Sequence, residues 1–110
     1  MLYRRAYSRP GDKRFTNPDG TATSRAFALR TGEAELSVDV ASLTTPEISI
    51  KDPQKYNLFE IAVKSVENLE LQVFHDPFEG NEAHAGIAGM TEEDDITPGL
   101  LARSSRRVNV

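Results

Sequence analysis

Apolar and polar residues alternate most regularly between Glu33 and Val40, and this period of two predicts a β-strand. The polar face contains Glu35, Ser37 and Asp39. The apolar face consists of Ala34, Leu36, Val38 and Val40. Because successive side chains of a strand point to opposite faces, we expect the apolar set to face the core.

Two further segments are expected to be strands. Residues 2–7 form a short strand with Arg4 and Arg5 on opposite faces, and residues 58–63 are mostly apolar. Between the first of these and the rest of the chain, residues 8–20 contain two prolines, two glycines and an Asn-Pro-Asp-Gly turn, so we expect a loop there.

Residues 69–89 have the pattern of one β-hairpin that holds both histidines of the chain. Alternation in the first arm stops at Asp76-Pro77, which cannot continue a central strand, and Glu79-Gly80-Asn81 supplies turn residues. With the turn centred near Glu79-Gly80, His75 and His84 are predicted to lie opposite each other, with Cβ atoms about 5 Å apart.

Short helices are predicted where threonine precedes proline, because threonine caps a helix and proline suits its first turn. Thr45-Pro46 begins one or two helical turns within residues 46–55, and Thr97-Pro98 begins a helix over about 97–107. For residues 21–30 the pattern leaves a short helix and an irregular strand open. These elements indicate a single α+β domain over residues 1–110, with an antiparallel sheet of four to five strands.

Composition narrows the class of protein. The net charge of −4 and the pI near 5.1 argue against a general affinity for nucleic acid. The absence of cysteine excludes disulfides, thiolate metal sites and a thiol nucleophile, and it fits a cytoplasmic protein. No stretch approaches the ~20 apolar residues of a membrane span, so we expect no membrane association, and no motif indicates a cofactor.

Positive charge is concentrated in the first quarter of the chain, in contrast to the acidic remainder. Six cations and two acids, Asp12 and Asp19, lie there, and aromatic residues are interleaved with them. The cations are Arg4, Arg5, Arg9, Lys13, Arg14 and Arg25, and the aromatic residues are Tyr3, Tyr7, Phe15 and Phe27. This composition suits an acidic partner surface or a nucleic acid, and equally an ordinary solvated loop that offsets the acidic remainder.

The histidines allow three interpretations. His75, Asp76 and His84 have ligand types that suit zinc or iron, although adjacent residues of a strand point to opposite faces. Alternatively, His75, Asp76 and Asn81 hold the hairpin loop through hydrogen bonds to the backbone. In the third, a histidine is a general base oriented by Asp39 or Asp76.

A catalytic histidine also needs a substrate-binding group and, for covalent catalysis, a nucleophile. Arg4, Arg5 and Arg25 are candidates for binding an anionic substrate, and Ser24 or Ser37 for the nucleophile, although neither serine lies in a known nucleophile motif.

Three arginines lie toward the end of the second predicted helix. Arg103, Arg106 and Arg107 are expected near its C-terminal end, where cations complement the negative pole of the helix dipole. A phosphate contact is the alternative for this cluster. Together with the N-terminal cations it would form one positive face, if the fold brings the two groups together.

The order of segments resembles that of a group of small uncharacterised bacterial proteins. The segments are LYRR, TSRAF, LSVDVASLTTPE, VFHDP, NEAHAGIAG and LLARSSRRV. The resemblance spans nearly the whole chain, and it implies neither an activity nor site residues.

From the sequence we expect a non-enzymatic binding or accessory protein that acts with a macromolecular partner, most simply another protein. The alternatives are a small hydrolase or transferase that uses His75, His84 and Asp76 on an anionic substrate, and a nucleic-acid adaptor. The expected binding residues are Arg4, Arg5, Ser24, Arg25, His75, Asn81 and His84, and no metal ligand is assigned.

Overall fold

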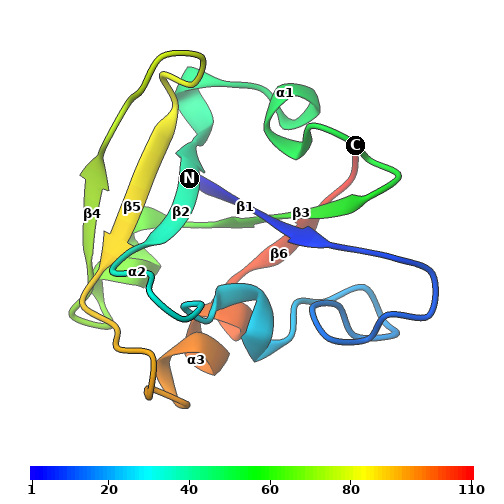
Figure 1. Ribbon diagram of the computed structural model, residues 1–110, viewed down its shortest axis with the longest axis horizontal. Helices are drawn as coiled ribbons and strands as arrows, with labels where there is room; N and C mark the ends of the chain where they lie inside the picture. The colour runs from blue at the N-terminus through cyan, green and yellow to red at the C-terminus, as the bar shows by residue number, and fades with distance from the viewer.

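Six antiparallel strands form one open sheet in the order β4-β5-β2-β1-β3-β6 (Figure 1). The structure is a computed structural model that describes residues 1–110. The strands are β1 (Leu2–Tyr7), β2 (Leu36–Val40), β3 (Tyr56–Ile61), β4 (Gln72–His75), β5 (His84–Ala88) and β6 (Arg106–Val108). The helices are η1 (Ser24–Phe27), η2 (Ala41–Leu43), α1 (Pro46–Ile50), α2 (Val63–Glu67) and α3 (Thr97–Ser104).

The α+β class is confirmed, but the sheet has six strands in place of the expected four to five. The helix predicted over about 97–107 ends at Ser104, because Ser105 adopts an extended conformation with φ −91° and ψ 165°. Arg106 then pairs with Glu60 of β3, through both the strand register and an ion pair. β6 therefore pairs with β3 through opposite charges across the two strands, and its sequence lacks the alternation of apolar and polar residues that predicts a strand.

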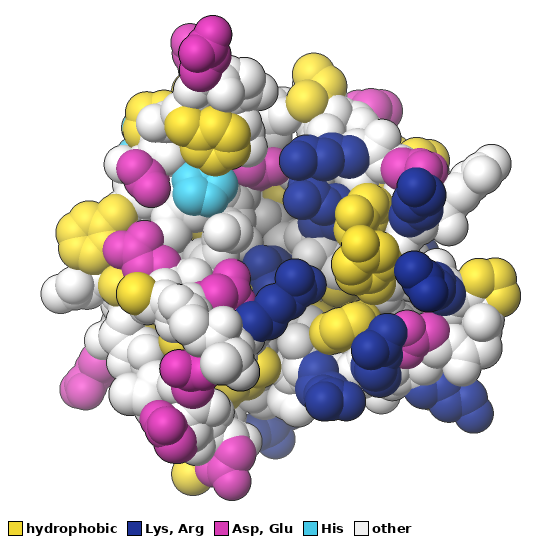
Figure 2. Space-filling model, in the orientation of Figure 1, with side chains coloured by type: hydrophobic (Ala, Val, Ile, Leu, Met, Phe, Trp, Pro, Cys, Tyr) yellow, Lys and Arg dark blue, Asp and Glu magenta, His cyan; other side chains and the backbone are white.

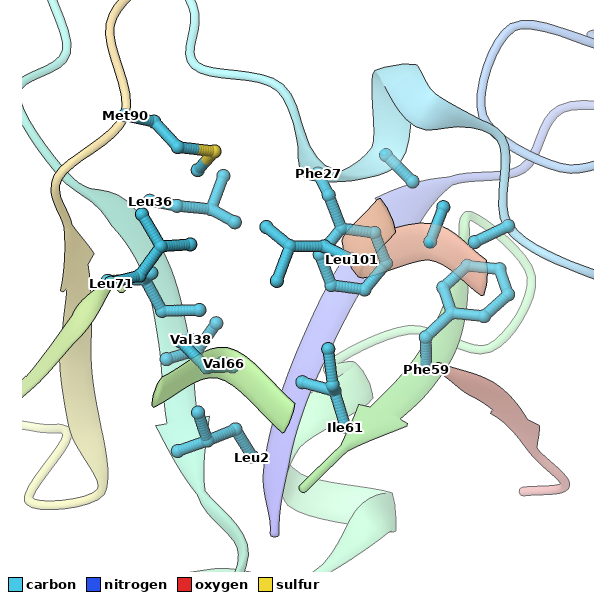
Figure 3. Close-up of a cluster of buried hydrophobic side chains, with 14 of the residues drawn as sticks. Leu2, Phe27, Leu36, Val38, Phe59, Ile61, Val66, Leu71, Met90 and Leu101 are labelled. Atoms are coloured by element: carbon cyan, nitrogen blue, oxygen red, sulfur yellow. The ribbon is translucent and has the colours of Figure 1, made fainter. Parts of the chain in front are cut away.

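One face of the sheet holds the main core, covered by η1, α2 and α3 (Figures 1 and 3). Leu36 and Val38 of β2 point into it with 0% and 3% exposure, which confirms the predicted inward face at those two positions. Ala34 lies before the strand and is exposed. The other large side chains of this core are Leu2, Phe27, Phe59, Ile61, Val66, Leu71, Ile87, Met90 and Leu101.

The opposite face of the sheet is covered only in part, by the single turn of α1. As predicted, Thr45 caps this helix, its Oγ1 accepting a hydrogen bond from Ile48 N at 3.3 Å, with Pro46 in the first turn. Ile50 of α1 is buried, and so is Leu58 of β3, which points to this side. Beyond α1 this face is left open.

The hairpin of β4 and β5 has a different register from the predicted one. His75 pairs with Ala85, one residue away from His84, and the turn is closed by a bridge between Phe78 and Asn81. Because side chains alternate along a strand, this one-residue difference places His75 and His84 on opposite faces of the sheet. The prediction that the two imidazoles face each other is wrong.

Residues 8–20 form the expected loop, and residues 21–30 contain the 3-10 helix η1. The loop packs beside β3 and β6: Asn57 donates to Thr16 Oγ1 at 2.9 Å, and Arg107 donates to Asn57 Oδ1 at 2.6 Å. Of the C-terminal arginines, Arg107 thus reaches the N-terminal loop, whereas Arg106 is paired with Glu60. None of the helices has the length and apolarity needed to span a bilayer.

Candidate anion-binding site

The strands β1 and β2 separate soon after they meet, and this separation creates the site. They pair only at Leu2 with Val40 and at Tyr3 with Asp39, whereas β1 pairs with β3 along its whole length. Beyond Tyr3, the edge of β1 that faces β2 is therefore free of strand partners. Arg4 and Arg5 lie at this opening.

Arg4 bridges the opening through its guanidinium group. Its Nε donates to Ala26 O of η1 at 2.8 Å, and its Nη1 donates to Ser37 O of β2 at 2.8 Å. On the other face, Arg5 Nη1 donates to Ser49 O of α1 at 2.9 Å. Carbonyl oxygens fix both guanidinium groups without neutralising them, because neither has a carboxylate oxygen within 4.0 Å.

Burial lowers the pKa of Arg4 to about 10, the nearby Glu33 opposes this shift, and Arg30 and Arg5 add to it. The group is still charged at neutral pH. A cation that is largely removed from water and lacks a counterion favours an incoming anion.

A cleft of about 230 Å³ opens on the α1 side of the sheet, and we call it the central cleft. Its lining combines three cations with hydrogen-bonding groups. The lining residues are Tyr3, Arg4, Arg5, Ser37, Val38, Asp39, Lys51, Phe78, Asn81 and His84. Lys51 ends α1 with a φ of 65°, in the left-handed region that few residues other than glycine adopt.

Asp39 fixes the hairpin loop to the central cleft. Its buried carboxylate accepts hydrogen bonds from Ser49 Oγ at 2.7 Å and from Asn81 Nδ2 at 3.0 Å. Asn81 Oδ1 in turn accepts from Ala83 N at 3.2 Å. These bonds hold the loop that leads into β5, and so they position His84.

His84 lies between the hairpin loop and β2. Its Nδ1 is 2.9 Å from the carbonyl oxygen of Asp76 and 3.9 Å from the Asp76 carboxylate, and its Nε2 is 3.4 Å from Ser37 Oγ. The ring of Phe78 packs against the imidazole, with 5.0 Å between the ring centroids. The side chain of His84 is 20% exposed, so it is partly shielded but open to the central cleft.

A second cleft of about 340 Å³, which we call the basic cleft, adjoins the central one. Five arginines line it together with apolar residues of β1 and η1. They are Arg4, Arg5, Arg14, Arg25 and Arg30. Of these, only Arg14 has an acidic partner, Asp12, at 2.8 Å. Figure 2 shows basic side chains gathered around the middle and right of this face, whereas most acidic ones lie toward its left side.

Tyr7 of the basic cleft has a tyrosine neighbour on β3. Tyr7 and Tyr56 pack together with ring centroids 4.9 Å apart. The guanidinium of Arg9 lies 5.9 Å from the ring of Tyr7, and that of Arg5 lies 5.0 Å from the ring of Tyr56. Each ring therefore has an aromatic neighbour and a cationic one.

The predicted site residues lie in three separate cavities, except Ser24, which lies outside the two clefts. Arg4, Arg5, Asn81 and His84 line the central cleft, and Arg25 lines the basic cleft. Ser24 is exposed on η1 outside both clefts. His75 lines a separate hollow beside Pro77 and Phe78, with its Nε2 2.7 Å from the carbonyl of Glu82.

This distribution overturns the paired-histidine hypothesis, because the two imidazoles face different cavities. No group of three His, Asp or Glu side chains is close enough to coordinate a metal ion. Lys51 and Phe78 were not predicted as lining residues, because their positions depend on the end of α1 and on the shape of the hairpin loop.

Comparison of the chain with protein families, with curated proteins and with solved structures finds no match. The fold and the clefts define the protein as a small α+β protein with a cationic face on an acidic chain.

Proposed function

We propose that this is a binding protein whose cationic face docks an acidic segment of a partner protein. The cationic face comprises the lining of the basic cleft and the adjoining cations of the central cleft: Arg4, Arg5, Arg14, Arg25, Arg30 and Lys51. The observation that carries the proposal is the lack of acidic partners for five of these six residues.

Unpaired cations favour a partner for an energetic reason. Like charges near one another repel, and the positive charges of Arg30 and Arg5 lower the pKa of Arg4 for this reason. A carboxylate-rich segment would relieve this repulsion, and complementary charge also steers diffusional encounter. The absence of cysteine fits a cytoplasmic location, which we include in the proposal.

A protein partner fits the face better than a single-stranded nucleic acid. Single strands bind by stacking bases on free aromatic rings, in addition to phosphate contacts. Here the rings of Tyr7 and Tyr56 are already engaged by each other and by Arg9 and Arg5.

The test uses fluorescently labelled poly-glutamate as the probe and a single-stranded oligonucleotide as the comparator. The variant is the double substitution Arg25→Glu with Arg30→Glu, two exposed residues with no ion pair. We expect it to weaken poly-glutamate binding by about tenfold or more at low salt, and less at high salt.

The matched control is Lys64→Glu with Arg103→Glu, which changes the net charge equally but on α2 and α3. It should weaken binding much less than the Arg25 and Arg30 double substitution, because Lys64 and Arg103 line neither cleft. Equal losses in the two double variants, or preference for the oligonucleotide over poly-glutamate, would contradict the proposal.

A further inference from the structure

Ser37 and His84 form a nucleophile and base pair at the central cleft that docking of an acidic segment does not require. We propose that this pair is an esterase site, in which Ser37 attacks carboxylic esters that carry an additional anionic group. The inference goes beyond the binding function, and it depends on the arrangement of the cleft between β2 and the hairpin loop.

The hydrogen bonds of His84 define the tautomer of its neutral imidazole. A carbonyl oxygen only accepts hydrogen bonds, so the Nδ1 that lies 2.9 Å from Asp76 O must carry the proton. The Nε2 atom then keeps its lone pair and faces Ser37 Oγ at 3.4 Å. This is the tautomer that a general base needs, and such contacts are commonly longer in the absence of substrate.

The surroundings hold both partners in place. Ser37 lies on β2, whose backbone pairs with β5 and whose Ser37 carbonyl accepts from Arg4. His84 is fixed by Asp76 O, by the ring of Phe78 and by the loop that Asp39 holds. The Asp76 carboxylate, 3.9 Å from Nδ1, favours the imidazolium that forms when His84 takes a proton.

The cations of the cleft define the substrate class. Arg5 and Lys51 line the same cavity as Ser37 and His84, and neither has an acidic partner. Lys51 can bind a carboxylate of the substrate while Arg5 stabilises the oxyanion that develops on the ester carbonyl. The volume of about 230 Å³ restricts the substrate to a small acyl group.

The chemistry is a two-step acyl transfer to water. Ser37 Oγ bonds to the ester carbonyl carbon while its proton passes to His84 Nε2. The carbon–oxygen bond to the alcohol then breaks, and the alcohol leaves with that proton. Water, activated by His84 in the same way, attacks the acyl-serine and releases the carboxylic acid and the free Ser37 hydroxyl.

The experiment follows hydrolysis of mono-4-nitrophenyl glutarate, which is anionic, and of 4-nitrophenyl butyrate, which is neutral. Intact-mass measurement of the quenched reaction detects the acyl group, and peptide mapping locates it. We expect an acyl adduct on Ser37, and a loss of about 100-fold or more in glutarate hydrolysis for Ser37→Ala and for His84→Gln. Ser37→Cys should restore adduct formation.

Three further variants separate the site from background imidazole chemistry. Ser42→Ala on η2 and His75→Gln on the opposite sheet face are matched controls and should keep the wild-type rate. Lys51→Ala should raise KM for the glutarate ester more than for the butyrate ester, because only the glutarate ester has a carboxylate for Lys51 to bind. Undiminished hydrolysis by Ser37→Ala, or an adduct only on other residues, would overturn the proposal, and thermal unfolding verifies that each variant is folded.

Discussion

Arg4 and Arg5 are consecutive in the chain, yet their guanidinium groups contact different parts of the protein. Arg4 contacts the carbonyls of Ala26 and Ser37, and Arg5 contacts that of Ser49. Alternation along β1 separates the two side chains, and the opening beside β2 brings both to the clefts. Two adjacent arginines, placed where the pairing of β1 with β2 ends, thus contribute cations to both clefts.

The Asp12 carboxylate is expected to titrate far below its ordinary value. The Arg14 side chain donates to it, with Nη2 at 2.8 Å, and lowers its pKa to about 2. The ionised form therefore stabilises the folded state, and this contribution declines as the pH falls from 3.8 through about 2. An NMR titration should give the low pKa in the wild type and a value closer to 3.8 in Arg14→Gln, which loses the ion pair but keeps the hydrogen bond from the backbone N of residue 14; an ordinary pKa in the wild type would rule out the ion pair.

Val38 is expected to contribute to the main core in proportion to its burial. Its side chain is 3% exposed, so Val38→Ala should lower the free energy of unfolding by roughly 1–3 kcal/mol through lost burial and the cavity left behind. Urea denaturation measures this loss. An unchanged midpoint would mean that the core side of β2 is not packed in solution.

The elements differ in how far local sequence determines them. Thr45 and Pro46 define the start of α1, and the alternation in β2 identifies its buried face, so both were predicted from the sequence. β6 was not, because two arginines after a helix have the pattern of a helix end, and only the position of Glu60 on β3 makes them a strand. Pairing partners distant in the chain are not visible in local patterns.

The hairpin shows the same limit for the candidate site. Its arms were predicted, but its register depends on the bridge at Phe78 and Asn81 and on the bond from Asn81 to Asp39. A one-residue shift was enough to separate the histidines and to place His84 beside Ser37. The residue types of the site were recognisable from the sequence, whereas their combination required the fold.

The cap of α1 gives a test for a single element. Thr45→Ala removes the acceptor for Ile48 N and should lower the free energy of unfolding by about 1 kcal/mol. Ser42→Ala, an exposed position without a side-chain hydrogen bond on the neighbouring η2, is the control and should have almost no effect. Equal urea midpoints for the two variants would show that the cap does not stabilise α1.

Charge is distributed unevenly over the whole protein. The chain carries a net charge of −4, yet the cations around β1 form one face with few acidic partners. The low overall pI therefore says little about what this face binds. Local charge, and not the total, determines which partner approaches it.

Sulfate should stabilise the folded protein more than chloride at equal ionic strength. Divalent anions that bind the clefts of the folded state shift its equilibrium by mass action, whereas screening alone depends only on ionic strength. Thermal unfolding should show a higher midpoint in sulfate, and Arg5→Gln should reduce this difference relative to Lys64→Gln. Because sulfate also stabilises proteins generally, an equal response of the two variants would exclude specific binding at the clefts.

β1 lies inside the sheet, between β2 and β3, although it is the first strand of the chain. During synthesis it has no neighbour until residues 36–61 have followed it, and pairings between such distant segments form slowly. The central cleft draws on β1, β2, the end of α1 and the hairpin loop, so it does not exist in a partly folded chain. Anion binding at the central cleft would therefore report that these elements have come together, and a partner that needs this cleft would select only molecules in which they have.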